Sequence, residues 1–265
     1  MPIARVLLFL ATLGILVVAG RSIVVGPPPI ALALAMSGAY VGLVLFGVFR
    51  LHARMFADAF VEGPPGARGI VLTFDDGPDP TSTPLVLEAL AAAHATATFF
   101  LIGRKAEAFP DLVREIVRRG HRVGMHSYAH DRLFALRSAK DVRRDLERGL
   151  AALEGITGER PRLFRPPIGH TNPTIARIAD ELDLVMVGWS HSARDGTSGT
   201  RPAAVASRMK RALRDGAILL LHDAAERGGR VPAGVQALPE VLRAAYDARL
   251  EVVTLDAWVD VTDQA

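Results

Sequence analysis

The chain has 265 residues, half of them apolar, and it contains no cysteine, which excludes disulfides and thiolate metal sites. Its net charge of +3 comes from arginines scattered among aspartates and glutamates. No nucleic-acid-binding motif accompanies that charge, so nucleic acid is not a predicted partner, whereas an anionic lipid or polymer stays open.

Two uncharged apolar runs, residues 6–20 and 30–49, open the chain. The second is long enough to cross a bilayer, which takes about 20 helical residues. Residues 21–29 lie between the runs and contain three consecutive prolines, which a helix interior does not tolerate. We therefore expect a transmembrane helical hairpin with the lipid bilayer as its partner. The first run also fits the apolar core of a signal peptide.

From residue 69 onward, short apolar runs alternate with amphipathic helical patterns. The runs predicted as strands are residues 69–74, 97–102, 121–125, 162–165, 184–187, 217–221 and 251–255. The predicted helices are residues 83–94, 106–119, 138–155, 173–183, 202–214 and 235–248. This alternation predicts an α/β fold with a parallel sheet, and seven strands suit a closed or nearly closed barrel of (β/α)7 type. The expected domains are a membrane anchor at 1–54, a linker at 55–68 and a catalytic domain at 69–265.

Two adjacent carboxylates, Asp75 and Asp76, follow the first predicted strand and precede a Gly-Pro turn. Neighbouring side chains on a strand point to opposite sides, so the two carboxylates cannot do the same job. Buried carboxylates are costly unless a metal or hydrogen bonds satisfy them. Taken alone, the pair also fits an ordinary acidic turn.

Further polar residues follow the later strands. His126 and His130 are four residues apart, so on one face of a helical turn they can share a metal, or they form a chance surface pair. Arg165, followed by two prolines, is a rigidly placed cation suited to a carboxylate, or part of a structured loop. Asp195 follows the fifth run, and His222 directly follows the sixth, where a positioned acid or base is favoured.

The carboxyl ends of parallel barrel strands meet at one rim, where active sites lie. The side chains expected there are Asp75, Asp76, His126, His130, Arg165, Asp195 and His222. Two imidazoles and a carboxylate suit a divalent metal with open coordination positions. A second carboxylate and a further histidine remain to accept and donate protons. The set predicts metal-assisted hydrolysis of an unactivated acyl bond.

These motifs resemble, in the same order, those of the NodB-homology polysaccharide deacetylases, carbohydrate esterase family 4, over residues 69–255. The matching segments are Thr-Phe-Asp-Asp-Gly-Pro at 73–78, His-Ser-Tyr-Ala-His at 126–130, Arg-Pro-Pro-Ile-Gly at 165–169, an altered fourth motif at 189–195 and Leu-Leu-His at 220–222. The resemblance implies a distorted barrel and one divalent metal ion, zinc or else cobalt or another metal. It also implies removal of N-acetyl groups from the amino sugars of a peptidoglycan- or chitooligosaccharide-like glycan.

The resemblance also implies a role for each matched residue. Asp75 corresponds to the catalytic base, which Arg165 orients, and His222 corresponds to the general acid, which Asp195 tunes. The implied metal ligands are Asp76, His126 and His130. The backbone N–H of Ile168 corresponds to the oxyanion donor, a role that needs no particular side chain. The other residues expected at the substrate are Pro167, Trp189 and Leu220.

The fourth motif departs from the family pattern. The family usually has Asp-x-x-Asp-Trp there, whereas this chain has Gly196 at the tryptophan position and an additional His191. An aromatic residue is also usual where Ile168 stands. These changes predict an acyl pocket that is wider or walled by another residue, and they leave the usual substrate in question.

Alternative functions follow from the same residues. One is deacylation of a lipid-linked amino sugar at the membrane face, and another is a non-catalytic glycan-binding relative. A metal-dependent phosphoesterase is disfavoured because the second ligand cluster of a two-metal site is missing. The oligomeric state is not defined by the sequence.

Two observations disagree on which side of the membrane the catalytic domain lies. Arg5, Arg50 and Arg54 flank the spans on the domain side and only Arg21 lies on the loop side, which favours a cytoplasmic domain. The family resemblance favours the extracytoplasmic side. We expect a multi-pass protein of the cell membrane with its catalytic domain outside.

Overall fold

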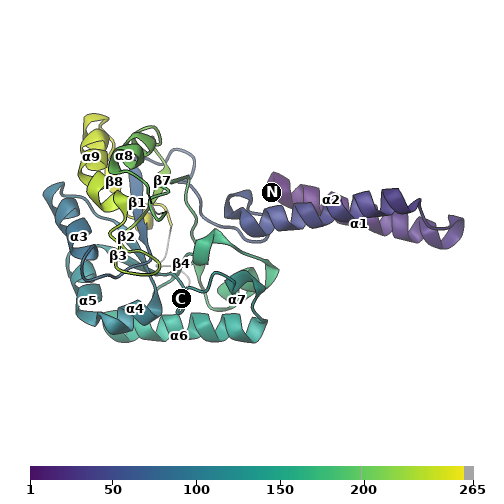
Figure 1. The fold of residues 1–265 in the computed structure, drawn as a ribbon, viewed down its shortest axis with the longest axis horizontal. Helices are drawn as coiled ribbons and strands as arrows, with labels where there is room; N and C mark the ends of the chain where they lie inside the picture. The colour runs from purple at the N-terminus through teal and green to yellow at the C-terminus, as the bar shows by residue number, and fades with distance from the viewer. Residues whose placement is uncertain (198, 260–265) are drawn as a thin grey trace.

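Two long helices project from an α/β domain in the computed structural model, which describes residues 1–197 and 199–259 (Figure 1). The helices are α1 (Ile3–Val25), α2 (Ile30–Phe49), α3 (Thr83–Ala92), α4 (Gly103–Ala108), α5 (Pro110–Arg118), α6 (Ala139–Thr157), α7 (Pro173–Glu181), α8 (Pro202–Lys210) and α9 (Ala233–Asp247). The strands are β1 (Ile70–Asp75), β2 (Thr98–Leu101), β3 (Arg122–Met125), β4 (Leu163–Phe164), β5 (Val185–Met186), β6 (His191–Ser192), β7 (Ala217–His222) and β8 (Val252–Val253).

The strands pair in parallel in the order β5-β4-β3-β2-β1-β7-β6, and β8 pairs with β1. Every residue of the central strand β1 is buried, as its near-continuous apolar sequence predicts for a parallel strand covered on both faces. The register of the ladder places Asp75 opposite Phe100 on one side and His222 on the other. The carboxyl ends of β1 and β7, which carry these two polar side chains, therefore lie at the same edge of the sheet.

The sheet curls because its two outermost strands lie close together in the chain. β5 and β6 are separated only by residues 187–190. The amide of Val187 donates to Phe164 in β4, and the amide of Ser190 donates to Ile218 in β7. One short stretch thus reaches both ends of the sheet. The result is a curled parallel half-barrel flanked by helices, consistent with the (β/α)7 type.

Two details of the predicted element order are wrong. The structure has an additional strand, β6, in the fourth-motif segment, where two residues pair with β7. The single helix predicted over residues 106–119 is two helices, α4 and α5, separated at Phe109. Pro110 disfavours helical backbone in the residue before it, and Phe109 accordingly has φ −133° and ψ 58°. All other predicted strands and helices are present, although β4, β5 and β8 are shorter than predicted.

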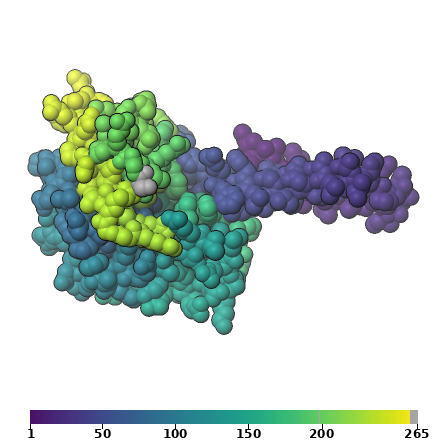
Figure 2. Space-filling model, viewed as in Figure 1, coloured from purple at the N-terminus to yellow at the C-terminus, as the bar shows by residue number. Residues whose placement is uncertain are grey.

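The amino-terminal hairpin stands apart from the domain as a rod of two helices lying side by side (Figure 1 and Figure 2). Both helices are long and apolar enough to cross a membrane, with mean hydropathies of 2.4 and 2.1, and only 6% of each hydropathy window is buried. A core helix of a water-soluble domain would instead be mostly buried. The start of α1 lies at the domain end of the rod, where Arg5 forms an ion pair with Asp58.

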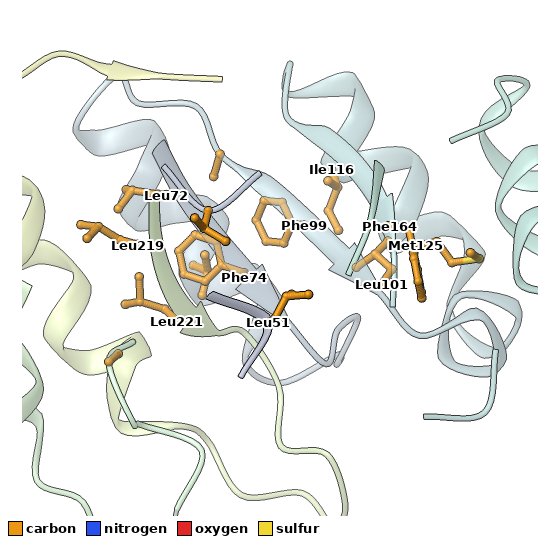
Figure 3. Packing of buried hydrophobic residues seen from close by; sticks show 14 of the residues in the cluster. Leu51, Leu72, Phe74, Phe99, Leu101, Ile116, Met125, Phe164, Leu219 and Leu221 are labelled. Atoms are coloured by element: carbon orange, nitrogen blue, oxygen red, sulfur yellow. The ribbon is translucent and has the colours of Figure 1, made fainter. Parts of the chain in front are cut away.

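The chain leaving α2 enters the main hydrophobic core. Leu51 is 4% exposed and belongs to the same buried cluster as Phe74 and Leu221 (Figure 3). Ala57, Ala59 and Val61, within the predicted linker, belong to it as well. The amide of Thr171 also donates to the carbonyl of Val48, in the last turn of α2. The hairpin is therefore attached to the domain by packing and hydrogen bonding.

Candidate active site

The turn after β1 separates the two adjacent carboxylates. Asp75 is the last residue of the strand, whereas Asp76 has left it with φ +75°, a value that non-glycine residues rarely adopt. Asp75 Oδ1 lies 2.6 Å from Nη1 of Arg165. Asp76 Oδ1 lies 3.2 Å from Nε2 of His130 and 3.7 Å from Nε2 of His126. Asp75 Oδ2 also lies 3.7 Å from Nε2 of His126, so both carboxylates approach this imidazole. They differ in their shorter contacts, which join Asp75 to Arg165 and Asp76 to His130.

His126 and His130 come together on a bent loop. The predicted helical turn is wrong, because Ser127 and His130 have φ values of +62° and +51°. The Ser127 hydroxyl accepts a hydrogen bond from the His130 amide, and Asp145 of α6 accepts from the amides of Tyr128 and Ala129. These hydrogen bonds hold the loop in place, and Nε2 of each imidazole faces Asp76 Oδ1 at the distances given above.

These three residues fit a divalent metal ion. One ligand atom from each of Asp76, His126 and His130 lies within 4.8 Å of the others, and all three residues are buried. Asp76 Oδ1 is buried without a hydrogen-bond partner, a costly arrangement that a cation would satisfy. His126 Nδ1–H donates to the Arg165 carbonyl at 2.8 Å, which leaves Nε2 free to bind metal. Three protein ligands are typical of catalytic zinc sites.

The imidazoles of the set are neutral, as metal ligands must be. Burial lowers the pKa of His126 to about 3, and a hydrogen bond to the Arg165 carbonyl only partly offsets this effect. Burial, followed by the neighbouring His126, lowers the pKa of His130 to about 4. At neutral pH each of the two imidazoles beside the buried Asp76 carboxylate therefore has a nitrogen that carries no proton. This arrangement favours binding of a metal cation, because metal ligands must be deprotonated.

Arg165 is fully buried and fixes Asp75. Its guanidinium donates to Asp75 and to the Thr73 hydroxyl at 2.9 Å, and to the carbonyls of Val187 and Gly188. It also lies over the Phe100 ring, 4.1 Å from its centroid. Burial raises the pKa of Asp75, and the Arg165 charge opposes that rise. Asp75 is therefore a buried carboxylate that Arg165 holds in position, and it is more basic than a carboxylate in water.

His222 lies at the end of β7 with Asp195 behind it. Its Nδ1 is 2.8 Å from Asp195 Oδ1, and its backbone amide donates to Oδ2 of the same carboxylate. Burial alone would lower the pKa of His222, but the hydrogen bond and charge of Asp195, with Asp76 and Asp75 beyond, raise it to about 9. The imidazole is thus protonated at neutral pH and able to donate a proton.

The loop after Arg165 is a short 3-10 turn, Pro167–Gly169, in which Ile168 has φ +60°. Pro167 is buried and the Ile168 side chain is 44% exposed. Gly169, with φ +72°, packs against the indole of Trp189, where an added Cβ would lie 2.5 Å from the ring. Leu220, 4% exposed, belongs to β7 two residues before His222. All residues predicted at the substrate therefore lie at or next to the same rim.

Gly196, at the position of the missing tryptophan, lies beside His222. A Cβ added there would be 3.5 Å from Cε1 of the imidazole. A side chain at this position would cover one side of the general-acid candidate. In this chain Gly196 has no side chain that could do so, and a wider acyl pocket, or one walled by another residue, stays a prediction.

Sequence reasoning missed several residues that support the rim. Lys105 donates to the Asp76 carbonyl at 2.7 Å and to the Ala225 carbonyl at 2.8 Å. Glu226 Oε1 lies 3.6 Å from Nδ1 of His130. For Glu226, the one sequence signal is its position four residues after His222, the last residue of β7. Lys105 and the loop-binding Asp145 lie on helices without any distinguishing motif.

Comparison with known proteins gives the family. Residues 62–187 match the polysaccharide deacetylase family. A peptidoglycan-N-acetylglucosamine deacetylase of Bacillus cereus is 36% identical over 189 residues, covering 70% of this chain and 87% of that protein. A chitooligosaccharide deacetylase of Sinorhizobium fredii is 37% identical over 161 residues, 60% of this chain and 73% of that protein. This chain belongs to the polysaccharide deacetylase family of hydrolases.

Solved structures agree with the assignment. The structure of a peptidoglycan N-acetylglucosamine deacetylase has a TM-score of 0.72 and 29% identity, covering 77% of this chain and 94% of that one. A mutant of a family 4 pseudoenzyme with restored enzymatic activity has a TM-score of 0.69 and 26% identity, covering 78% and 73%. The family thus includes a relative described as a pseudoenzyme, so membership of the family does not by itself establish catalysis.

Proposed function

We propose that this protein is a membrane-anchored, metal-dependent hydrolase that removes N-acetyl groups from the amino sugars of a glycan. The observation that carries the proposal is the buried cluster of Asp76, His126 and His130 beside two proton carriers, Asp75 and His222. The same observation disfavours a non-catalytic glycan-binding relative. We assign the anchor to residues 1–54, the linker to 55–68 and the catalytic domain to 69–265.

Each polar group of the site has its own role in the proposed reaction. Asp76, His126 and His130 would bind one divalent ion, zinc or cobalt, which as a Lewis acid lowers the pKa of water and polarises the amide carbonyl. Asp75, positioned by Arg165, accepts the proton of the attacking water. The Ile168 N–H donates to the oxyanion. His222 donates a proton to the departing nitrogen as the C–N bond breaks, so the products are acetate and a free amine.

The reaction is tested by incubating the purified full-length protein in detergent with an N-acetylglucosamine oligomer or a peptidoglycan fragment. We expect acetate and free amine to appear in equal amounts. Binding of the oligomer without either product would support the non-catalytic alternative, and release of phosphate from a phosphoester would support a phosphoesterase.

The pH dependence should reveal the pairing of His222 with Asp195. The protonated imidazole is the active form, so activity is lost as pH rises through its pKa of about 9. In Asp195→Asn the charge of Asp195 is lost, and only Asp76 and Asp75 still oppose the effect of burial, so the alkaline limb of kcat/KM should move down from about 9 toward the ordinary histidine pKa of 6.5. An unchanged pH–rate profile would show that Asp195 does not tune the acid.

We further propose that α1 and α2 both cross the cell membrane and that the domain lies on the extracytoplasmic side. The exposed apolar surface of both helices and the names of the peptidoglycan deacetylase relatives support this topology. The chain has no cysteine, so single cysteines can test it. Ala151 is exposed on α6, and Val25 is 64% exposed at the far end of the hairpin.

An impermeant maleimide should label Ala151→Cys in intact cells and label Val25→Cys only after lysis. The reverse pattern would place the domain in the cytoplasm. Labelling of both cysteines in intact cells would show that the hairpin does not span the membrane.

A further inference from the structure

A pocket of about 690 Å3 lies between the end of the hairpin and the substrate side of the active site. Arg50 and His52, just beyond α2, line one side of it. Ile168 and Trp189, both predicted to lie at the substrate, line another. Arg194 and Arg208 also line the pocket. The pocket therefore connects the membrane anchor with the oxyanion loop.

The wall formed by the hairpin is fixed in place. Val48 accepts the hydrogen bond from Thr171, two residues after the oxyanion loop, at 3.1 Å. The Phe49 ring meets the His170 ring edge-on, with centroids 4.8 Å apart. Leu51 is buried against Gly188, where an added Cβ would lie 3.3 Å from it. The end of the anchor is thus part of the pocket wall.

The pocket is positively charged. Three arginines line it, and none of its lining residues is acidic. His52 and His191 add no charge at neutral pH, because burial is the largest influence and lowers the pKa of each. Glu62 is the acid that acts on both imidazoles, and it forms an ion pair with Arg214 at 3.0 Å.

Two of the three arginines are available to a ligand. Arg208 donates to the carbonyl of Ala193. The side chains of Arg50 and Arg194 form no hydrogen bond or ion pair within residues 1–197 and 199–259. Arginine recognises phosphate oxygens through paired N–H donors, and free guanidinium groups in a pocket without acids favour such an anion.

We infer that this pocket binds the phosphate of a lipid-linked amino sugar, and that such a molecule is the substrate of the adjacent site. The inference rests on the proposed deacetylation. In a 2-acetamido sugar 1-phosphate the phosphate-bearing and amide-bearing carbons are neighbours, which suits a phosphate pocket that shares Ile168 and Trp189 with the acyl site. The lipid tail would follow the exposed apolar surface of α2, where Phe46 is 51% and Phe49 is 53% exposed.

The test compares three substrates with the full-length protein in mixed micelles: polyprenyl-diphosphate-linked N-acetylglucosamine, N-acetylglucosamine 1-phosphate and an uncharged N-acetylglucosamine oligomer. We expect the highest kcat/KM for the lipid-linked sugar. In the double variant Arg50→Gln/Arg194→Asn, that value should fall by about ten- to a hundredfold, the effect of losing charged hydrogen bonds, while the oligomer rate is unchanged. Asparagine is chosen because Arg194 has φ +52°, which asparagine tolerates.

Arg249→Asn is the matched control, because Arg249 is also exposed, has φ +56° and lies in the turn just after α9, outside the pocket lining. It should leave all three rates unchanged. An equal loss on the oligomer in the double variant, or a lipid-linked rate no higher than that of the sugar 1-phosphate, would overturn the inference. So would weaker binding of the double variant to phosphatidylglycerol vesicles with unchanged substrate kinetics. Absence of acetate from every substrate would instead contradict the proposed function.

Discussion

Replacing His126 with alanine is expected to abolish both metal binding and acetate release. His126 is 2% exposed, and its Nε2 faces Asp76 while its Nδ1–H is bonded to the Arg165 carbonyl. The variant leaves two of the three proposed ligands. We expect metal affinity to fall by more than the roughly 10- to 100-fold that removal of an outer-shell partner costs. Metal analysis of the purified variant, together with its acetate release, checks the expectation.

His121→Ala is the matched control for this variant. His121 is also a buried histidine, 5% exposed, with a pKa lowered to about 4 mainly by burial, but it packs against Phe99 away from the metal set. The control separates loss of a buried imidazole from loss of a ligand. It should retain its metal, whereas wild-type metal content in His126→Ala would contradict the ligand assignment.

Asp75→Asn is expected to retain metal and lose turnover. The amide has the shape of the carboxylate and leaves an oxygen for Arg165, which lies 2.6 Å away in the wild type. It cannot accept a proton, so kcat should fall by roughly 10²- to 10⁴-fold, the usual effect of general acid–base catalysis. Single-turnover acetate release and metal content, measured on one preparation, check both parts.

Asp223→Asn provides the comparison for Asp75→Asn. Asp223 is also a fully buried carboxyl at this rim, with a pKa raised to about 7 by burial, but its partner is the Thr83 hydroxyl. Its amide variant should change the rate much less. Equal losses in the two variants would show that Asp75 acts through local structure, and full activity of Asp75→Asn would exclude it as the base.

The sequence predicts the rim well because local patterns encode it. The apolar run of β1 followed by two carboxylates places Asp75 at a strand end, and the alternation of strands and helices implies a parallel sheet with one chemical edge. The pairing of Asp75 with His222 then follows from the register of adjacent strands. Residues at other strand ends, such as Arg165, meet the same edge for the same reason.

Other features depend on contacts between distant segments, which local patterns do not encode. β6 exists only because its two residues meet β7. The loop of His126 and His130 takes its shape from Asp145, on a helix that shows no sign of the role. The attachment of the hairpin through Leu51 requires the folded core. The arginine-lined pocket forms from four separate stretches of the chain.

Titration of the metal-free protein with zinc or cobalt tests the central claim most directly. Acetate release from one N-acetylated substrate would be measured against metal bound per chain. If Asp76, His126 and His130 form the catalytic metal site, activity is absent without metal, rises with occupancy and reaches its maximum at one ion per chain. Full acetate release by the metal-free protein would contradict the account.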